Sequence, residues 1–207
     1  MPIVTISRMY GSGGSEVAER VARMLGWELL DNALIDAVAE RMGMSPEEVS
    51  EREERVPSLV ERLAKALTLA TPETLPPPEA TLAEPPEDQL VAVTRRVMEE
   101  AVARGPVVVV GRGAQSMLAE RTDALHVFCY ASRAALVARV AKRLGVSEQE
   151  AAKTVDETNA QREQFVKRHW KRGWRTVENY HLCVNTDWLG IDGAAALIVD
   201  AARTRFR

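Results

Sequence analysis

Short apolar runs alternate along the chain with stretches of helical periodicity, and this alternation constrains the fold more than any other feature. The runs fall at residues 2–7, 27–30, 107–110, 124–130 and 181–185, and apolar residues spaced three or four apart follow them. Strands that alternate with helices form parallel sheets covered by helices on both faces. We therefore predict an α/β fold with a five-stranded parallel sheet, in which ligands bind at the carboxyl ends of the strands.

Length and composition fit one globular domain. The 207 residues are 46% hydrophobic and 28% charged, which permits a large core and excludes global disorder. Apolar runs such as residues 107–110 are far short of the roughly 20 residues that cross a bilayer. No basic-then-apolar leader opens the chain, so we expect a cytoplasmic protein with no membrane partner. Cys129 and Cys183 both lie in apolar runs and are expected to be reduced core thiols.

We expect a single domain over residues 1–207 that carries two helical additions. The first is an acidic helical insert at residues 45–100, and six of the ten prolines fall within residues 71–88, which we predict to be a mobile loop. The second is a helical region at residues 145–175. Residues 133–175 hold 11 basic and 5 acidic side chains, a pattern that favours an anionic ligand, although a solvated helix face has the same composition.

A glycine-rich segment between the first strand and the first helix is the most informative motif. Backbone N–H groups of such a turn converge on phosphate oxygens, and the helix N-terminus adds partial positive charge. The segment partly matches the pattern GxxxxGK(S/T), with Arg8 at the first glycine and Gly14 at the lysine. A tight structural turn is the alternative. The predicted phosphate-binding residues are Gly11, Ser12, Gly13, Gly14 and Ser15.

Two further side chains lie at predicted strand ends. Arg112, between Gly111 and Gly113, follows the apolar strand 107–110, where its guanidinium can bind a phosphate with two hydrogen bonds. A surface turn arginine is the alternative. Asp31 ends the second strand and can either face the same crevice, near a substrate or Mg²⁺, or cap the next helix.

The basic segment indicates a lid. Phosphoryl transfer is largely electrostatic, and arginines that close over the site are a common solution. An ordinary salt-bridged helix has the same mixture of charges. Trp170 and Trp174 would also suit base stacking, but a net charge of −3 disfavours nucleic acid as a partner. The predicted lid arginines are Arg139, Arg162 and Arg168.

Together these segments resemble the cytidylate kinase-like family of P-loop nucleoside monophosphate kinases. The matching stretches are VTISRMYGSGGSEVAERVA, WELLDNALIDAVAE, VVVVGRGA, ASRAALVARVAKRLGVSEQEAAKTVDETNAQRE and NYHLCVNTDWLGIDGAA. The resemblance implies a P-loop fold and transfer of the γ-phosphoryl group of ATP, with Mg²⁺, to a nucleoside monophosphate. CMP and dCMP are the acceptors that it favours. It implies that residues 11–15 wrap the donor phosphates, that Ser15 approaches the metal, that Arg112 binds the acceptor phosphate and that Asp31 lies beside the acceptor.

The chain departs from that pattern in one important respect. Cytidylate kinases carry a lysine in the loop, whereas this sequence has Gly14 there and Glu16 where a threonine is expected. Losing one such charged contact typically costs about 10²- to 10³-fold in rate. Arg8 is therefore a candidate for the missing charge. The alternatives are a nucleotide-binding regulator without catalysis, or a kinase of another small hydroxylated metabolite. The apolar stripe at residues 59–69 suggests a possible homodimer, although packing within the domain explains it equally.

Overall fold

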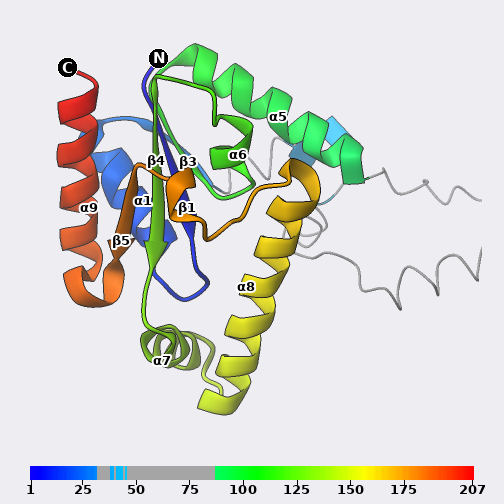
Figure 1. Cartoon of the computed structure of the whole chain (residues 1–207), viewed down its shortest axis with the longest axis vertical. Coiled ribbons are helices and arrows are strands. Elements are labelled where there is room, and N and C mark those ends of the chain that lie inside the picture. The colour runs from blue at the N-terminus through cyan, green and yellow to red at the C-terminus, as the bar shows by residue number, and fades with distance from the viewer. Residues whose placement is uncertain (32–37, 40, 44, 46–86) are drawn as a thin grey trace, which may run out of the picture.

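The computed structural model describes residues 1–31, 38–39, 41–43, 45 and 87–207. Its centre is one parallel sheet with the strand order β2-β3-β1-β4-β5 (Figure 1), which confirms the predicted five-stranded α/β architecture. The strands are β1 (Ile3–Arg8), β2 (Glu28–Leu30), β3 (Val107–Val110), β4 (Ala124–Tyr130) and β5 (Leu182–Asn185). Composition agrees with this order, because the strands beside β1 are apolar throughout in β3 and apolar except for His126 in β4, which suits burial on both faces.

Helices cover both faces of the sheet (Figure 1). On one face, Val4, Ile6 and Val108 pack against α1 (Gly14–Leu25) and α9 (Thr186–Arg205). On the other, Ile3 and Val107 pack against α5 (Glu87–Arg104) and the short α6 (Ala114–Met117). Successive residues of a strand point to opposite faces of the sheet, so their side chains belong to two separate apolar clusters.

Two helices extend beyond the carboxyl ends of the strands. They are α7 (Arg133–Leu144) and α8 (Glu148–Trp170), which pack against each other. Ser132 caps α7, and Ser147 and Glu150 form a capping box at the start of α8. A 3-10 turn, η1 (Val177–Asn179), joins α8 to β5.

The sequence-based boundaries differ from the structure in few places. A helix is predicted for residues 191–205; α9 contains that helix, and a further turn from Thr186, capped by Asn185, precedes it across a break at Gly190, whose φ is 68°. The prediction of two core thiols is wrong for Cys183, which is exposed, whereas Cys129 is buried. Strand β5 lies at the edge of the sheet, and Val184 is the one buried residue among its four.

The acidic insert falls mostly outside the described residues. The apolar stripe at 59–69 lies there, and so does the predicted proline-rich loop as far as residue 86. Residues 87 and 88, which were predicted to be part of that loop, begin α5. Within the described ranges, no helix is long and apolar enough to cross a membrane.

Candidate phosphate-transfer site

The glycine loop lies where the sequence predicts it, between β1 and α1. Gly11 and Gly13 have φ values of 82° and 75°, a region that favours glycine. Space also requires them: a Cβ atom at Gly11 would lie 2.8 Å from the carbonyl oxygen of Leu136, and one at Gly13 would overlap the side chain of Ile191. The loop is therefore shaped by close packing against α7 and α9.

The backbone N–H groups of the loop fall into two sets. Those of Met9, Tyr10 and Ser12 donate to the Cys129 carbonyl, the Asn159 Oδ1 atom and the Met9 carbonyl, at 3.0, 2.8 and 3.1 Å. Among the described residues, the N–H groups of Gly11, Gly13, Gly14 and Ser15 have no hydrogen-bond acceptor. They are the donors that a phosphate would need, at the positive end of the α1 dipole.

One carbonyl group of the loop is held from outside. The Ser12 carbonyl accepts from Arg139 Nη1 at 3.0 Å and from the buried Thr186 hydroxyl at 2.6 Å, and Arg139 Nη2 also donates to the Thr186 carbonyl at 2.9 Å. In a trans peptide the N–H group points opposite to the C=O group. The Gly13 N–H is therefore turned away from Arg139 and Thr186. We call these two residues the loop clamp.

Helix α8 attaches to the same loop. Arg162 Nη1 donates to the Arg8 carbonyl at 3.0 Å, one turn after Asn159 holds the Tyr10 N–H. The guanidinium groups of Arg143 and Arg162 lie 4.8 and 5.6 Å from the centre of the Tyr10 ring. The predicted lid thus contributes Arg162 to the site, together with Asn159, which sequence reasoning missed because a lone amide in a helix carries no motif.

Arg112 lies at the end of β3, as predicted, and its side chain is only 7% exposed. It is therefore not a surface turn residue. Its φ of 54° lies between Gly111 at 68° and Gly113 at 69°, a run of left-handed conformations that turns the chain sharply. A Cβ atom at Gly113 would overlap Trp170, so the end of α8 packs directly on this turn.

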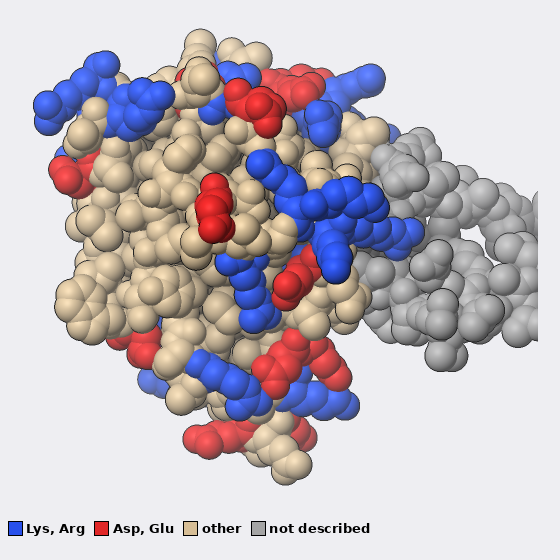
Figure 2. All heavy atoms as spheres, viewed as in Figure 1, with Lys and Arg blue, Asp and Glu red and all other residues tan. Residues whose placement is uncertain are grey.

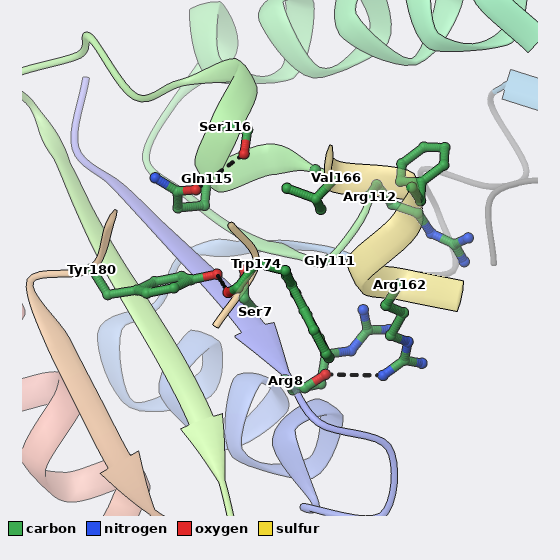
Figure 3. Close-up of a pocket in the computed structure, with 12 residues that line it drawn as sticks. Ser7, Arg8, Gly111, Arg112, Gln115, Ser116, Arg162, Val166, Trp174 and Tyr180 are labelled. Carbon is green, nitrogen blue, oxygen red and sulfur yellow. Dashed lines mark hydrogen bonds between the residues drawn. The ribbon is translucent and has the colours of Figure 1, made fainter. Parts of the chain in front are cut away.

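Arg112 lines a pocket that we call the arginine cavity (Figure 3). Arg8 and Arg162 lie on the same side of this cavity, and Tyr180 and Gln115 lie opposite. Burial raises the pKa of Tyr180 to about 12, and its hydroxyl donates to the Trp174 carbonyl at 2.7 Å. The phenol is therefore a neutral wall of the cavity and not a base. The lining residues used below are Ser7, Arg8, Arg112, Arg162, Trp174 and Tyr180.

A second pocket, the loop cavity, is open beside the glycine loop. Its lining includes Gly13, Gly14, Ser15 and Glu16, and it shares Arg8 and Arg162 with the arginine cavity. A third pocket, the outer pocket, lies on the outer side of the loop. It shares Arg143 and Glu16 with the loop cavity and is also lined by Lys142 and Ile191. The two shared arginines therefore lie between the predicted donor and acceptor regions.

Asp31 and Arg168 have different positions. The half-buried Asp31 lies at the end of β2, with Oδ1 3.8 Å from Arg8 Nη2. Arg168 is exposed in the last turn of α8 and lines none of these three pockets. Figure 2 shows Lys and Arg side chains gathered over this end of α8.

The site offers few ligands for a metal ion. Among the described residues there is no group of three or more His, Cys, Asp or Glu side chains that could hold a metal. The loop cavity does contain the Ser15 hydroxyl and the Glu16 carboxylate. Mg²⁺ commonly takes one or two protein oxygens and completes its shell with phosphate oxygens and water, so these residues fit an ion that arrives with a nucleotide.

Comparisons with known proteins agree with this geometry. A sequence model of the cytidylate kinase-like family matches residues 3–188. No curated protein matches the sequence. An uncharacterized protein from Eubacterium ventriosum has a similar structure, with a TM-score of 0.71, 17% identity and 99% of each chain covered.

Two other solved structures are more distant. The shikimate kinase from Bacteroides thetaiotaomicron matches with a TM-score of 0.53, 15% identity and 98% of each chain covered. The protein TT1252 from Thermus thermophilus matches with a TM-score of 0.52 and 21% identity, over 100% of this chain and 98% of that one. At such identities the likeness establishes the fold, which is that of the P-loop kinases. With the family match extending over most of its length, the chain belongs to the cytidylate kinase-like family.

Proposed function

We propose that this protein transfers the γ-phosphoryl group of ATP to a nucleoside monophosphate, with CMP and dCMP as the first acceptors to test. One observation carries the proposal: the loop cavity and the arginine cavity meet at Arg8 and Arg162. A phosphoryl group that moves between a donor in the first and an acceptor in the second passes these guanidinium groups. Charge on the transferred group is thereby stabilised, which is the main catalytic requirement of phosphoryl transfer.

On this proposal the donor phosphates bind the N–H groups of Gly11, Gly13, Gly14 and Ser15. The nucleoside part of ATP then extends into the outer pocket, whose rim carries Arg143 and Lys142. Mg²⁺, held by Ser15 together with the phosphates, would neutralise part of their negative charge. Glu16 lines the same cavity and is a second oxygen donor for the ion.

The acceptor phosphate binds Arg112 in the arginine cavity. One of its oxygens attacks the γ-phosphorus, the bond to the β,γ-bridging oxygen breaks, and ADP leaves. A phosphate monoester is already largely deprotonated near pH 7, since its second pKa is about 6, so the attack needs no general base. This agrees with a cavity in which Tyr180 is held as a neutral phenol and the nearby carboxylate, Asp31, faces Arg8.

The same argument disfavours a hydroxylated metabolite as acceptor. A hydroxyl group must lose its proton during attack, and a base within hydrogen-bond reach normally receives it. Among the described residues of the arginine cavity there is no carboxylate or histidine. Arg168 is exposed and lines none of the three pockets. We therefore assign transfer to Arg8, Arg112 and Arg162.

The test measures ADP release with ATP, Mg²⁺ and a panel of nucleoside monophosphates, together with shikimate and gluconate as hydroxyl acceptors. We expect turnover that depends on CMP or dCMP, and a loss of about 10²-fold or more for Arg112→Met. Calorimetry on the same samples measures ATP binding. Tight ATP binding without turnover on any acceptor would support a nucleotide-binding regulator instead of an enzyme. Turnover with shikimate or gluconate but with no nucleoside monophosphate would show that the acceptor is a hydroxylated metabolite.

A further inference from the structure

The position of the P-loop lysine is occupied here by a glycine whose backbone does not require glycine. Gly14 begins α1 and is not among the residues with positive φ. A side chain is excluded for another reason: a Cβ atom at position 14 would overlap the Cβ atom of Arg8 and lie 2.8 Å from its Cγ atom. The stem of Arg8 therefore fills the space in which a lysine side chain at position 14 would begin.

From there the Arg8 side chain continues across the carboxyl edge of the sheet. A Cβ atom at Gly111 would overlap Arg8 Nη1 and lie 2.9 Å from Cζ, so a second glycine makes room for the guanidinium group. Arg8 Nη2 lies 3.8 Å from Asp31 Oδ1, and the two side chains are 12% and 19% exposed. The guanidinium is thus enclosed at the junction of the loop cavity and the arginine cavity (Figure 3).

The charge of Arg8 lies at the point where a phosphate in either cavity would meet it. Arg8 Nη2 and Asp31 Oδ1 form an ion pair there at 3.8 Å. In a partly enclosed site of low effective dielectric, an anion that approaches more closely would interact strongly with the same guanidinium.

We propose that Arg8 replaces the P-loop lysine, so that the cation of the loop has moved from the start of α1 to the end of β1. Gly14 is then the position that must stay without a side chain to admit it, and Gly111, whose φ of 68° already favours glycine, leaves room for its guanidinium group. This inference rests on the proposed function for its catalytic part, because Arg8 would stabilise the γ-phosphoryl group during transfer. Its steric part is independent of any activity.

The steric part is tested by a double-mutant cycle of urea unfolding with Gly14→Ala and Arg8→Gly. In the wild-type background Gly14→Ala should lower the urea concentration at the midpoint of unfolding, because the new methyl group clashes with the Arg8 side chain. In the Arg8→Gly background the same change should leave the midpoint unchanged or raise it, since alanine is favoured over glycine in a helix. Equal effects in both backgrounds would overturn the idea that Arg8 excludes a side chain at position 14.

The charge is tested by calorimetry with ATP and ADP on Arg8→Met, which keeps an unbranched stem, and on Arg8→Lys. We expect Arg8→Met to weaken ATP binding at least tenfold and ADP binding less, and to lower turnover by about 10²- to 10³-fold. Arg8→Lys should recover most of the ATP affinity. The matched control is Arg133→Met, because Arg133 is 63% exposed and pairs with Asp156 away from the pockets. Unchanged ATP affinity in Arg8→Met would overturn the replacement.

The double variant Arg8→Gly/Gly14→Lys tests whether a lysine at position 14 can take over the role of Arg8. We expect it to bind ATP at least tenfold more tightly than the single variant Arg8→Gly. Equal ATP affinities of the two variants would contradict the proposal that Arg8 stands in for the lysine. A wild-type protein that binds ATP but transfers phosphate to no acceptor would overturn only the proposed function, because the ATP affinities and the unfolding cycle still decide the role of Arg8. A wild-type protein that binds no ATP would overturn both.

Discussion

Ser12 shows how a residue inside a phosphate-binding motif can contribute through its backbone alone. Its side chain is fully buried, and its hydroxyl has no hydrogen-bond partner among the described residues. A buried hydroxyl without a partner costs free energy compared with a methyl group of similar shape. We expect Ser12→Ala to raise the free energy of unfolding, or leave it unchanged, and to keep ATP affinity within about threefold. Urea unfolding and calorimetry check this, and a tenfold loss of ATP affinity would show that the hydroxyl contacts the ligand.

Ser15 lies three residues further on and has the opposite expectation. Its hydroxyl lines the loop cavity, where the proposal assigns it to the Mg²⁺ ion. We expect Ser15→Ala to increase severalfold the Mg²⁺ concentration that gives half-maximal turnover, while the affinity for ATP without Mg²⁺ stays constant. A Mg²⁺ titration of the activity measures the shift, with Ser12→Ala as the control in the same loop. An unchanged Mg²⁺ dependence would remove Ser15 from the metal site.

Several elements begin and end where local chemistry alone predicts. Strands 107–110 and 124–130 have the predicted bounds, because Pro106 and Gly111 flank the first run, and the second, which is apolar except for His126, begins directly after Asp123. Ser132, Ser147 and Gly145 set helix ends through capping bonds that depend only on neighbouring residues. Arg112 was equally accessible, since a strand-end arginine between two glycines is visible in the sequence. These features need no knowledge of distant contacts.

Other features depend on contacts between distant segments and could not be predicted. Arg139 was expected in a lid that closes over the site, yet it bonds to Ser12 and Thr186, which lie 127 and 47 residues away in the sequence. The overlap between Arg8 and a side chain at position 14 is visible only once α1 lies against β1. The sequence therefore predicted which segments meet at the candidate site. It could not predict which atoms each arginine contacts there, because those contacts depend on how α1, α7 and α9 pack.

The loop clamp joins α7, α9 and the glycine loop, so its effect belongs to the arrangement of these elements. Thr186→Val keeps the shape of the side chain and removes the bond to the Ser12 carbonyl. We expect it to lower the free energy of unfolding by about 1 kcal/mol. It should also weaken ATP binding, because the Gly13 N–H loses its fixed direction, whereas the KM for the acceptor should change little.

Arg139→Met should act in the same way as Thr186→Val and more strongly, because Arg139 makes two hydrogen bonds to Thr186 and one to Ser12. Urea unfolding, ATP calorimetry and steady-state kinetics are measured on both variants. If Arg139→Met instead lowered kcat without any loss of stability or ATP affinity, Arg139 would contact the transferred phosphate, as the sequence alone suggests. Arg133→Met again serves as the exposed control on α7.

At the scale of the whole molecule, the centre of the sheet contains a group that couples stability to pH. His126 on β4 is buried beside β1, where the Thr5 hydroxyl lies 2.8 Å from its Nδ1 atom. Burial lowers the pKa of His126 from 6.5 to about 4, with smaller contributions from the nearby His181 and Arg172. The ring of His181 stacks on it with centroids 5.1 Å apart. The native sheet therefore holds a neutral imidazole.

Between pH 6.5 and about 4 the unfolded chain binds a proton at His126 that the folded chain does not bind. The free energy of unfolding should therefore be at its full value above pH 6.5, fall as the pH decreases through this window, and lose no more from His126 below about 4. The loss is at most about 3.5 kcal/mol, since each pKa unit corresponds to about 1.4 kcal/mol. Below that window Asp123, whose pKa is held far below its usual range by Arg121 and the N-terminal amine, should weaken the protein further.

Urea unfolding at a series of pH values separates the two groups, because they act in different windows. His126→Gln, which cannot titrate, should flatten the curve between pH 6.5 and about 4 and leave the steeper acid limb in place. Should that variant fold poorly, an NMR titration of the His126 ring in the wild-type protein gives the same information, since its signal should stay that of a neutral imidazole down to about pH 4. A ring that titrates near pH 6.5 in the folded protein would show that water reaches His126, and that the sheet is less tightly covered at β4 than the packing of Phe128 and Trp174 beside it implies.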